Sequence, residues 1–286
     1  LKRLLCYDPA RRITADEALR HPYFTHPGDS EGAVPLSALA PTFPMELAAR
    51  SPPGPFCHAE QALLDLETKN WHTVGGSDRV AAQHWCAGSL AERCALFRAM
   101  VVDWIVEVSH SFRLVPRTMH LAVAMLDAYM ARARRTTTAE LQKLGACCLY
   151  IASKIEDTAF ISAADMVHVG HDAFTRDEFL HTETKILASL EFCLRRATAF
   201  DFVQLALAQM EAPGGALATR RRGEGDDTGG GGDGDGDGTP SRERCLAEYL
   251  TELALHEYSL LSYLPSQLGA CCVALALHCT GAQPLT

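Results

Sequence analysis

The pentapeptide LGACC occupies residues 144–148 and recurs at residues 268–272, and each copy leads into an apolar run, LYIAS or VALAL. A string with two adjacent cysteines rarely recurs by chance, so one structural unit built twice from similar sequence is the simplest explanation. The first copy is apolar nearly all round from residue 144 to residue 152, which is typical of a helix enclosed by other helices. We therefore expect this pentapeptide on the central helix of a bundle.

Four further helical patterns accompany the first copy. The stretch RCALFRAMVVDWIVEVSHSFRL carries an apolar stripe at helical spacing, and a second helix is predicted over residues 118–132. Two more patterns follow the pentapeptide, near residues 162–169 and 176–190. The sequence thus predicts five helices within roughly a hundred residues.

The second copy belongs to a shorter unit. It begins at TAFDFVQLALAQM, is broken by an insertion, resumes at ERCLAEYLTELALHEYSLL and reaches the second pentapeptide shortly before residue 286. Three of the five helices are therefore expected, and a truncated bundle should leave apolar faces of its last helix uncovered. The predicted fold class is all-α, with tandem five-helix folds of which the second is truncated.

Composition limits the class of protein. The chain has 286 residues, a hydrophobic fraction of 48% and a formal net charge of −9, which opposes binding to nucleic acid through a basic face. The two cysteine pairs lie inside apolar runs, so we interpret them as small buried hydrophobes in a reducing compartment. The longest apolar stretches are roughly half of what a membrane span needs, so no membrane association is expected.

The first residues have a different character. LLCYDPARRITADEALRHPYF combines an N-cap at Asp8 with a capping box from Thr14 to Glu17. It resembles the last helices of the eukaryotic protein-kinase catalytic domain, especially in the cyclin-dependent group. That resemblance implies that Arg12 pairs with a glutamate further upstream, outside this chain, so residues 1–27 should not fold stably alone. A solvated helical hairpin is the alternative. The chain starts at Leu1 without a methionine, so we expect a fragment of a longer protein.

Residues 28–89 are rich in Pro, Gly, Ala and Ser and contain only a short amphipathic patch near residues 59–71. This composition predicts a disordered, flexible linker. The expected organisation is a kinase remnant (1–27), the linker (28–89), a first fold (90–194) and a partial second fold (195–286).

From about residue 93 onward the chain resembles a cyclin, most closely of the A and B types. The motifs that carry the resemblance are FRAMVVDWIVEV, LAVAMLD, LGACCLYIASKIED, DAFTRDEFLHTETKILASLEF and AEYLTELALHEYSLLSYLPSQLGACC. The resemblance implies a tandem five-helix fold that binds a cyclin-dependent kinase, in cis or in trans, and completes its active site. It also implies a regulator of the cell cycle, found in nucleus and cytoplasm, that is not itself an enzyme and needs no cofactor.

The resemblance assigns residues to three roles. Lys154 and Glu183 match the pair that the family presents to the kinase; alternatively, Lys154 only complements its own helix C-terminus and Glu183 is surface. Arg98 and Asp127 match an internal ion pair. The substrate-docking patch, which takes Arg-x-Leu motifs, corresponds to Phe97, Met100, Val101, Trp104, Glu107 and Gln142. Its apolar members could equally belong to the core, since a stripe at helical spacing is usually buried.

Departures from the family pattern leave the kinase preference open. The sequence AYM follows Asp127 where an Arg-Phe-Leu type of sequence is common. Ile155 and Asp157 replace the more usual aromatic and glutamate residues.

Residues 212–242 form a Gly- and Asp-rich insertion that cannot bury enough apolar surface to fold, so we expect a disordered loop. Its DGDGDG run resembles a calcium loop, but the twelfth position is Arg244 instead of glutamate, so no metal is expected. His168 and His171 lack a third ligand as well. Thr239 begins a Thr-Pro-Ser-Arg sequence of the form that cyclin-dependent kinases phosphorylate, and is a candidate phosphosite.

Two alternative functions remain from the sequence. The chain could be the C-terminal part of an active Ser/Thr kinase, although it contains no His-Arg-Asp and no Asp-Phe-Gly. It could also be a transcription adaptor with the same helical repeat, which the acidic balance opposes.

Overall fold

The computed structural model describes residues 57–73, 91–132, 138–171, 173–213, 215, 217 and 240–282. Every helix or strand element within these ranges is helical, as the all-α prediction requires. The kinase-like residues 1–27, the DGDGDG run and Thr239 lie outside the described residues.

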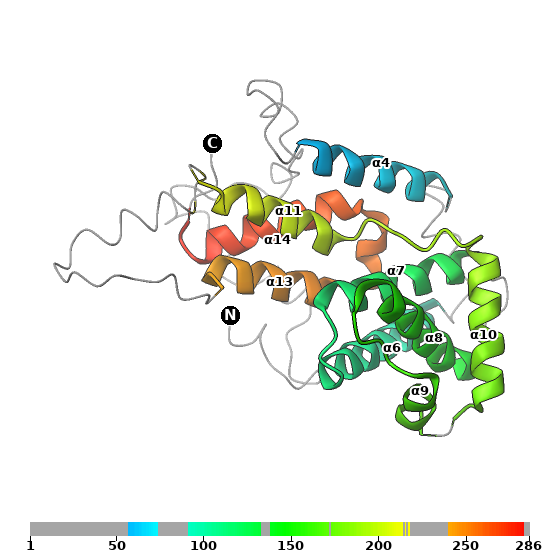
Figure 1. The fold of residues 1–286 in the computed structure, drawn as a ribbon. Coiled ribbons are helices and arrows are strands. Elements are labelled where there is room, and N and C mark those ends of the chain that lie inside the picture. Colours follow the sequence, from blue (N-terminus) through cyan, green and yellow to red (C-terminus); the bar gives the residue numbers. More distant parts are fainter. Residues whose placement is uncertain are drawn as a thin grey trace. The chain divides into compact units, whose positions relative to one another are not determined.

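The first five-helix fold, here called repeat 1, comprises α6 (Ala91–Ser111), α7 (Pro116–Arg132), α8 (Thr138–Glu156), α9 (Ala163–Val169) and α10 (Arg176–Ser189). Helix α8 packs against the other four and lies among them in Figure 1. Its apolar side chains and those of α6, α7 and α10 form one continuous core. The prediction of an enclosed central helix is confirmed.

The second fold, repeat 2, comprises α11 (Ala199–Glu211), α13 (Arg242–Ala254), the short 3-10 helix η4 (Tyr258–Ser262) and α14 (Pro265–Cys279). Helix α14 packs against α11 and α13 and forms with them a second, smaller core. The three predicted helices of the truncated unit are therefore present.

Sequence-local capping explains where several helices begin. Ser162, Thr175 and Thr198 each accept a hydrogen bond from the backbone N–H three residues later, and the acidic side chain at that later position bonds back. Two orphan backbone donors are thus satisfied reciprocally at the start of α9, α10 and α11.

The repeated pentapeptide has the same packing role in both units. A Cβ added to Gly145 would lie 2.5 Å from Val101 on α6, the first helix of repeat 1. A Cβ added to Gly269 would lie 2.8 Å from the carbonyl oxygen of Ala199 on α11, the first helix of repeat 2. The third helix of each unit therefore approaches the first so closely that only glycine fits, which explains why the string occurs twice.

The expectation that both cysteine pairs are buried is confirmed for Cys147 and Cys148, but it is wrong for one member of the second pair. Cys147 and Cys148 are fully buried and Cys272 nearly so, whereas Cys271 is exposed. Leu275, one turn further along α14, is 47% exposed. This is the uncovered apolar face expected for a truncated bundle.

The linker prediction needs a correction over residues 57–73. These residues form α4 (Cys57–Thr73), which packs against α11 and α14 of repeat 2. The amphipathic patch read from the sequence was the only local sign of it, because Pro- and Gly-rich composition on both sides favoured a linker. Among the described helices, none combines the length and apolarity that a bilayer crossing demands.

Candidate functional site

Lys154 and Glu183 meet on the surface of repeat 1. Lys154 lies in the last turn of α8 and Glu183 in the middle of α10, and the two side chains form an ion pair. The Lys154 ammonium also lies 4.0 Å from the centre of the Tyr150 ring. The Glu183 side chain is only 13% exposed and that of Lys154 33% exposed, so the pair bridges two helices at the protein surface.

The chemistry of this pair suits recognition more than stability. An ion pair that water can reach contributes little to folding, about 0–1 kcal/mol. An ammonium group has three donors and a carboxylate has several acceptor sites, so each member keeps hydrogen-bonding capacity for a third group. A backbone carbonyl or N–H of another chain could satisfy that capacity.

An exposed aromatic residue lies just beyond the same stretch of α10. Phe192 is 71% exposed, and its backbone N–H donates to the carbonyl of Leu187 at 3.0 Å. Glu191 and Phe192 both have positive φ, 53° and 58°, which is uncommon outside glycine. Arg132 on α7 holds this turn by bonding the Ser189 carbonyl and pairing with Glu191 at 3.5 Å. Sequence reasoning missed Phe192, because a left-handed turn built from ordinary residues leaves no local sequence signal.

The six residues of the expected substrate-docking patch differ in exposure. Met100 is 59% exposed and Glu107 is exposed, whereas Val101 is only 8% exposed and belongs to the core. Phe97, Trp104 and Gln142 are half-buried. Leu96, which the sequence reasoning did not include, is 60% exposed one turn before Met100. The surface that α6 offers is thus centred on Leu96 and Met100.

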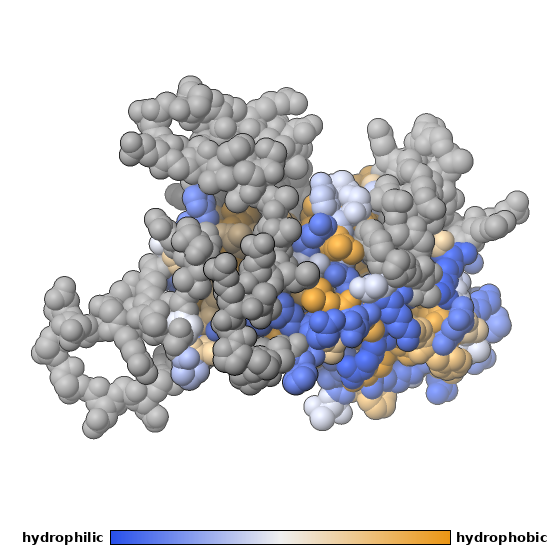
Figure 2. All heavy atoms as spheres, turned by 90° about the horizontal axis from the view of Figure 1, so that it is seen from above, coloured by the Kyte–Doolittle hydropathy of each residue, from blue (hydrophilic) through white to orange (hydrophobic). Residues whose placement is uncertain are grey.

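Exposed apolar side chains are not confined to α6, since Phe160 and Tyr263 are exposed as well. Figure 2 shows apolar side chains interspersed with hydrophilic ones across the visible described part of one face. Isolated apolar groups of this kind are normal on soluble proteins, so exposure alone does not identify a docking site.

Arg98 and Asp127 form a buried ion pair between α6 and α7. Arg98 donates from Nε and Nη2 to the two oxygens of Asp127, at 2.7 and 2.8 Å, and from Nη1 to the carbonyl of Leu255 at 2.7 Å. Burial alone would lower the pKa of Arg98, but Asp127 outweighs it and raises that pKa above its ordinary value. Since Leu255 follows α13, this pair also ties repeat 1 to repeat 2.

The two departures after Lys154 have different environments. Asp157 accepts from the backbone N–H of Val115 at 2.9 Å and from the Thr118 hydroxyl at 2.5 Å, so it fixes the turn into α7. Ile155 is half-buried and packs against the core of repeat 1. Asp157 therefore has a structural role in its own chain.

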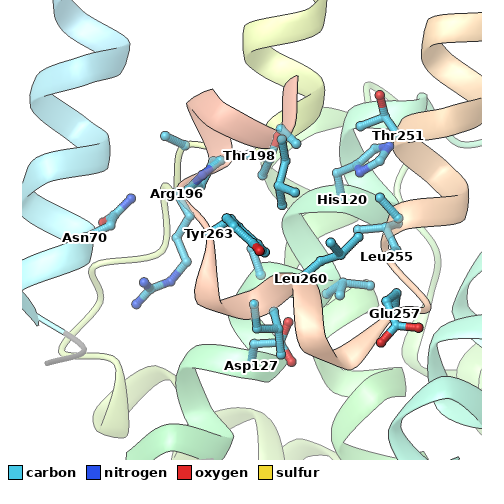
Figure 3. Close-up of a pocket in the computed structure, with 18 of the residues that line it drawn as sticks. Asn70, His120, Asp127, Arg196, Thr198, Thr251, Leu255, Glu257, Leu260 and Tyr263 are labelled. Carbon is cyan, nitrogen blue, oxygen red and sulfur yellow. The ribbon is translucent and has the colours of Figure 1, made fainter. Parts of the chain in front are cut away.

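A cavity of about 100 Å³ lies where α4, α7, α11, α13 and η4 meet (Figure 3). Among its lining residues is His120, which is fully buried and stacks on Phe200 with ring centres 4.8 Å apart. Neither ring nitrogen of His120 has a hydrogen-bond partner, and burial lowers its pKa to about 3. The imidazole is therefore neutral at physiological pH and acts as an apolar contact between α7 and α11.

Residues that could hold a metal do not gather in the described ranges. No group of three or more His, Cys, Asp or Glu side chains there has a ligand arrangement, and His168 and His171 belong to no such group.

Each of the two repeats contains a match to a family model. Residues 88–195 match the N-terminal domain of cyclins and residues 235–286 match the C-terminal domain of cyclins. The first match covers repeat 1, and the second covers α13 and α14.

Similar proteins include A-type cyclins. The chain is 33% identical over 185 residues to Cyclin-A1-2 of Arabidopsis thaliana, covering 64% of this chain and 36% of that protein. It is 30% identical over 190 residues to G2/mitotic-specific cyclin-A of Hydra viridissima, covering 66% and 39%. The chain therefore spans well under half of the length of these relatives.

A solved structure has the same fold. A viral cyclin from herpesvirus saimiri superposes with a TM-score of 0.52 at 20% identity, covering 66% of this chain and 72% of the other. At this identity the likeness concerns the arrangement of helices alone.

Proposed function

We propose that this chain binds and activates a cyclin-dependent Ser/Thr protein kinase. The chain belongs to the cyclin family, because the two matched cyclin domains together cover more than half of it. It acts as a regulatory module in cell-cycle control and has no turnover of its own. The observation that carries the proposal is the Lys154–Glu183 pair, partly exposed where α8 and α10 meet.

The surroundings of the pair support a protein partner. Phe192 offers a largely exposed ring beyond α10, on a turn that Arg132 holds. Ile155 and Leu187 are half-buried, so they leave apolar surface near the ion pair. Interface centres are enriched in aromatic and apolar anchors with polar groups around them, and a few such anchors contribute most of the binding energy. The kinase segment would pack on the apolar groups while its backbone bonds the pair.

A charge swap separates a contact role from a structural one. Lys154→Glu and Glu183→Lys each remove the internal ion pair, whereas the double variant restores it with reversed charges. If the pair contacts the kinase, all three variants lose affinity by tenfold or more in a pull-down with a panel of cyclin-dependent kinases. Recovery of wild-type affinity in the double variant would show that the pair is only structural.

We propose further that the parent polypeptide joins a kinase domain to this cyclin, so that activation occurs in cis. The support is the kinase-like sequence of residues 1–27. Tethering would raise the effective concentration to about the millimolar range. A transcript that continues upstream of Leu1 into a glycine-rich loop, His-Arg-Asp and Asp-Phe-Gly would establish this arrangement, and one that starts elsewhere would refute it.

Substrates or inhibitors with Arg-x-Leu motifs are proposed to dock on α6. The exposed side chain of Met100 supports this assignment, and the buried side chain of Val101 does not contribute to the contact. Met100→Ala should weaken phosphorylation of an Arg-x-Leu substrate severalfold and leave a substrate without the motif unaffected. Equal loss on both substrates would contradict docking here.

One further proposal concerns regulation by phosphorylation. Thr239 is proposed as a site of phosphorylation by the partner kinase, because it begins a Thr-Pro-Ser-Arg sequence. Phosphopeptide mapping after incubation with that kinase tests this proposal, and an unmodified Thr239 would refute it.

The proposed cellular location of the protein is the nucleus and cytoplasm, which imaging of the tagged protein tests.

A further inference from the structure

The N-cap residue of helix α14 supplies no capping side chain. Leu264 occupies its N-cap position and makes no side-chain capping bond, and Pro265 follows. The next backbone N–H, that of Ser266, needs an acceptor because the first turn of a helix leaves its donors unpaired. Gln267 bonds back to the N–H of Leu264 but cannot serve Ser266.

The missing cap comes from α4, 199 residues away in the sequence. One carboxylate oxygen of Glu67 accepts from the Ser266 backbone N–H at 2.7 Å, and the other accepts from the Ser266 hydroxyl at 2.9 Å. Glu67 is 6% exposed and Ser266 is 7% exposed. A carboxylate at this position also complements the positive end of the helix dipole.

On the face of α4 that packs against repeat 2, the most buried of the described side chains are polar. Leu63, Glu67 and Asn70 share one face, at spacings of four and three residues. Glu67 and Asn70 are buried, while among the described α4 side chains no apolar one is buried. Asn70 lines the cavity, and its Nδ2 has no hydrogen-bond partner (Figure 3). Few buried apolar contacts are the mark of an element that opens at low free-energy cost.

The placement of α4 gives its docking a consequence. It precedes repeat 1 in the sequence but packs on α11 and α14 of repeat 2. The first turn of α14 is therefore completed by a segment that lies on the far side of repeat 1 in the sequence.

We propose that the start of α14 and the adjoining surface of α11 form a docking site for a helix that presents a carboxylate, and that α4 is its detachable occupant. Glu67 is the positioning residue that selects the register, because its two oxygens match the N–H and the hydroxyl of Ser266. Undocking leaves these two groups to water, frays the first turn of α14 and opens the cavity beside Asn70. This device does not depend on which partner the rest of the molecule binds.

Hydrogen exchange on the full chain tests the proposal. Glu67→Ala should raise the exchange rate of the amides at Ser266, Gln267 and Leu268 by tenfold or more. Glu60→Ala, two turns earlier on the same helix, is the matched control and should leave these rates unchanged. A synthetic peptide of residues 57–73, added in excess to the Glu67→Ala chain, should restore protection, whereas the same peptide with alanine at position 67 should not.

Three outcomes would overturn the proposal. Wild-type exchange rates in Glu67→Ala would show that the carboxylate does not hold the helix. Lost protection that the wild-type peptide does not restore at millimolar concentration would show that α4 is not exchangeable. Loss of far-ultraviolet helicity throughout the Glu67→Ala chain would show that α4 is a permanent part of the fold.

Discussion

The two helices that carry LGACC share a sequence but not an environment. In α8, Cys147 and Ile151 are buried, and the Cys147 thiol donates to the carbonyl of Phe179 on α10 at 3.4 Å. In α14 the corresponding residues, Cys271 and Leu275, are exposed. Cys148 and its counterpart Cys272 are buried in both helices.

The difference follows from which neighbours each helix has. Both helices contact the first and second helices of their own repeat, so the glycine and the second cysteine have equivalent surroundings. Only α8 also has a fourth and a fifth helix within the described residues. The shared motif thus determines the inner contacts of the unit, and the later helices determine whether the outer face is buried.

The largest effect should come from a matched pair of truncations on these faces. Ile151→Ala removes a side chain that is 2% exposed, so it should lower the free energy of unfolding by about 2–5 kcal/mol. Leu275→Ala, at the equivalent position of α14, should cost less than about 1 kcal/mol because nearly half of the side chain already meets water. Urea unfolding followed by circular dichroism measures both. Equal losses would mean that a further element covers α14.

The inner contacts should respond alike in both repeats. Gly145→Ala and Gly269→Ala each place a methyl group closer than 3.0 Å to the first helix of the unit, so each should cost about 1–3 kcal/mol. The Gly269 change meets a backbone carbonyl, which side-chain rotation cannot relieve, and should be the harsher of the two. Thermal melts compare the pair with wild type. A neutral Gly269→Ala would contradict the close approach.

The junction between the repeats should be sensitive to acid. The folded-state pKa of His120 is about 3, below the ordinary value of 6.5, so the unfolded chain binds the extra proton first. The stability that neutral His120 permits is complete above pH 6.5 and falls as the pH drops toward 3, by about 2 kcal/mol between pH 7 and pH 5. Urea midpoints at several pH values measure the slope.

His120→Phe is the matched control for that titration, because it keeps a ring against Phe200 but cannot bind a proton. The difference between wild type and this variant should vanish at low pH or turn in favour of the variant. An unchanged slope in His120→Phe would assign the pH dependence to other groups.

The smallest effect concerns thiol access and involves no loss of stability. Burial raises the pKa of Cys147 and Cys148 well beyond the usual range, and that of Cys271 to a lesser extent. In the native state a maleimide should modify Cys271, faster at pH 9 than at pH 7 because the thiolate is the nucleophile, while Cys147 and Cys148 stay protected. Peptide mapping by mass spectrometry reads each site, with guanidinium-unfolded protein as the reference. Native labelling of Cys147 would disprove the enclosure of α8.

Much of repeat 1 could be predicted because its signals are local. The apolar stripe of the first helix and the pentapeptide both depend on residues a few positions apart. The predicted span 176–190 compares with the observed α10, Arg176–Ser189. Hydrophobic spacing and capping act within one helix, so one sequence contains them.

What could not be predicted depends on distant contacts or on backbone conformation. Ser266 of α14 donates two hydrogen bonds to Glu67 of α4, and nothing near Glu67 in the sequence indicates that partner. Met100 and Val101 are adjacent in one stripe, yet one is exposed and the other is core, because α8 covers only one side of α6. The left-handed turn at Phe192 has no sequence signature.

Activation of a kinase tests the central claim most directly. The full chain is titrated into each of a panel of purified cyclin-dependent kinases, and phosphate transfer to a peptide substrate is measured. We expect the activity of at least one kinase to rise and saturate near equal concentrations, and the Lys154→Glu variant to shift the curve by tenfold or more. A folded chain that leaves every kinase at its basal rate would contradict it.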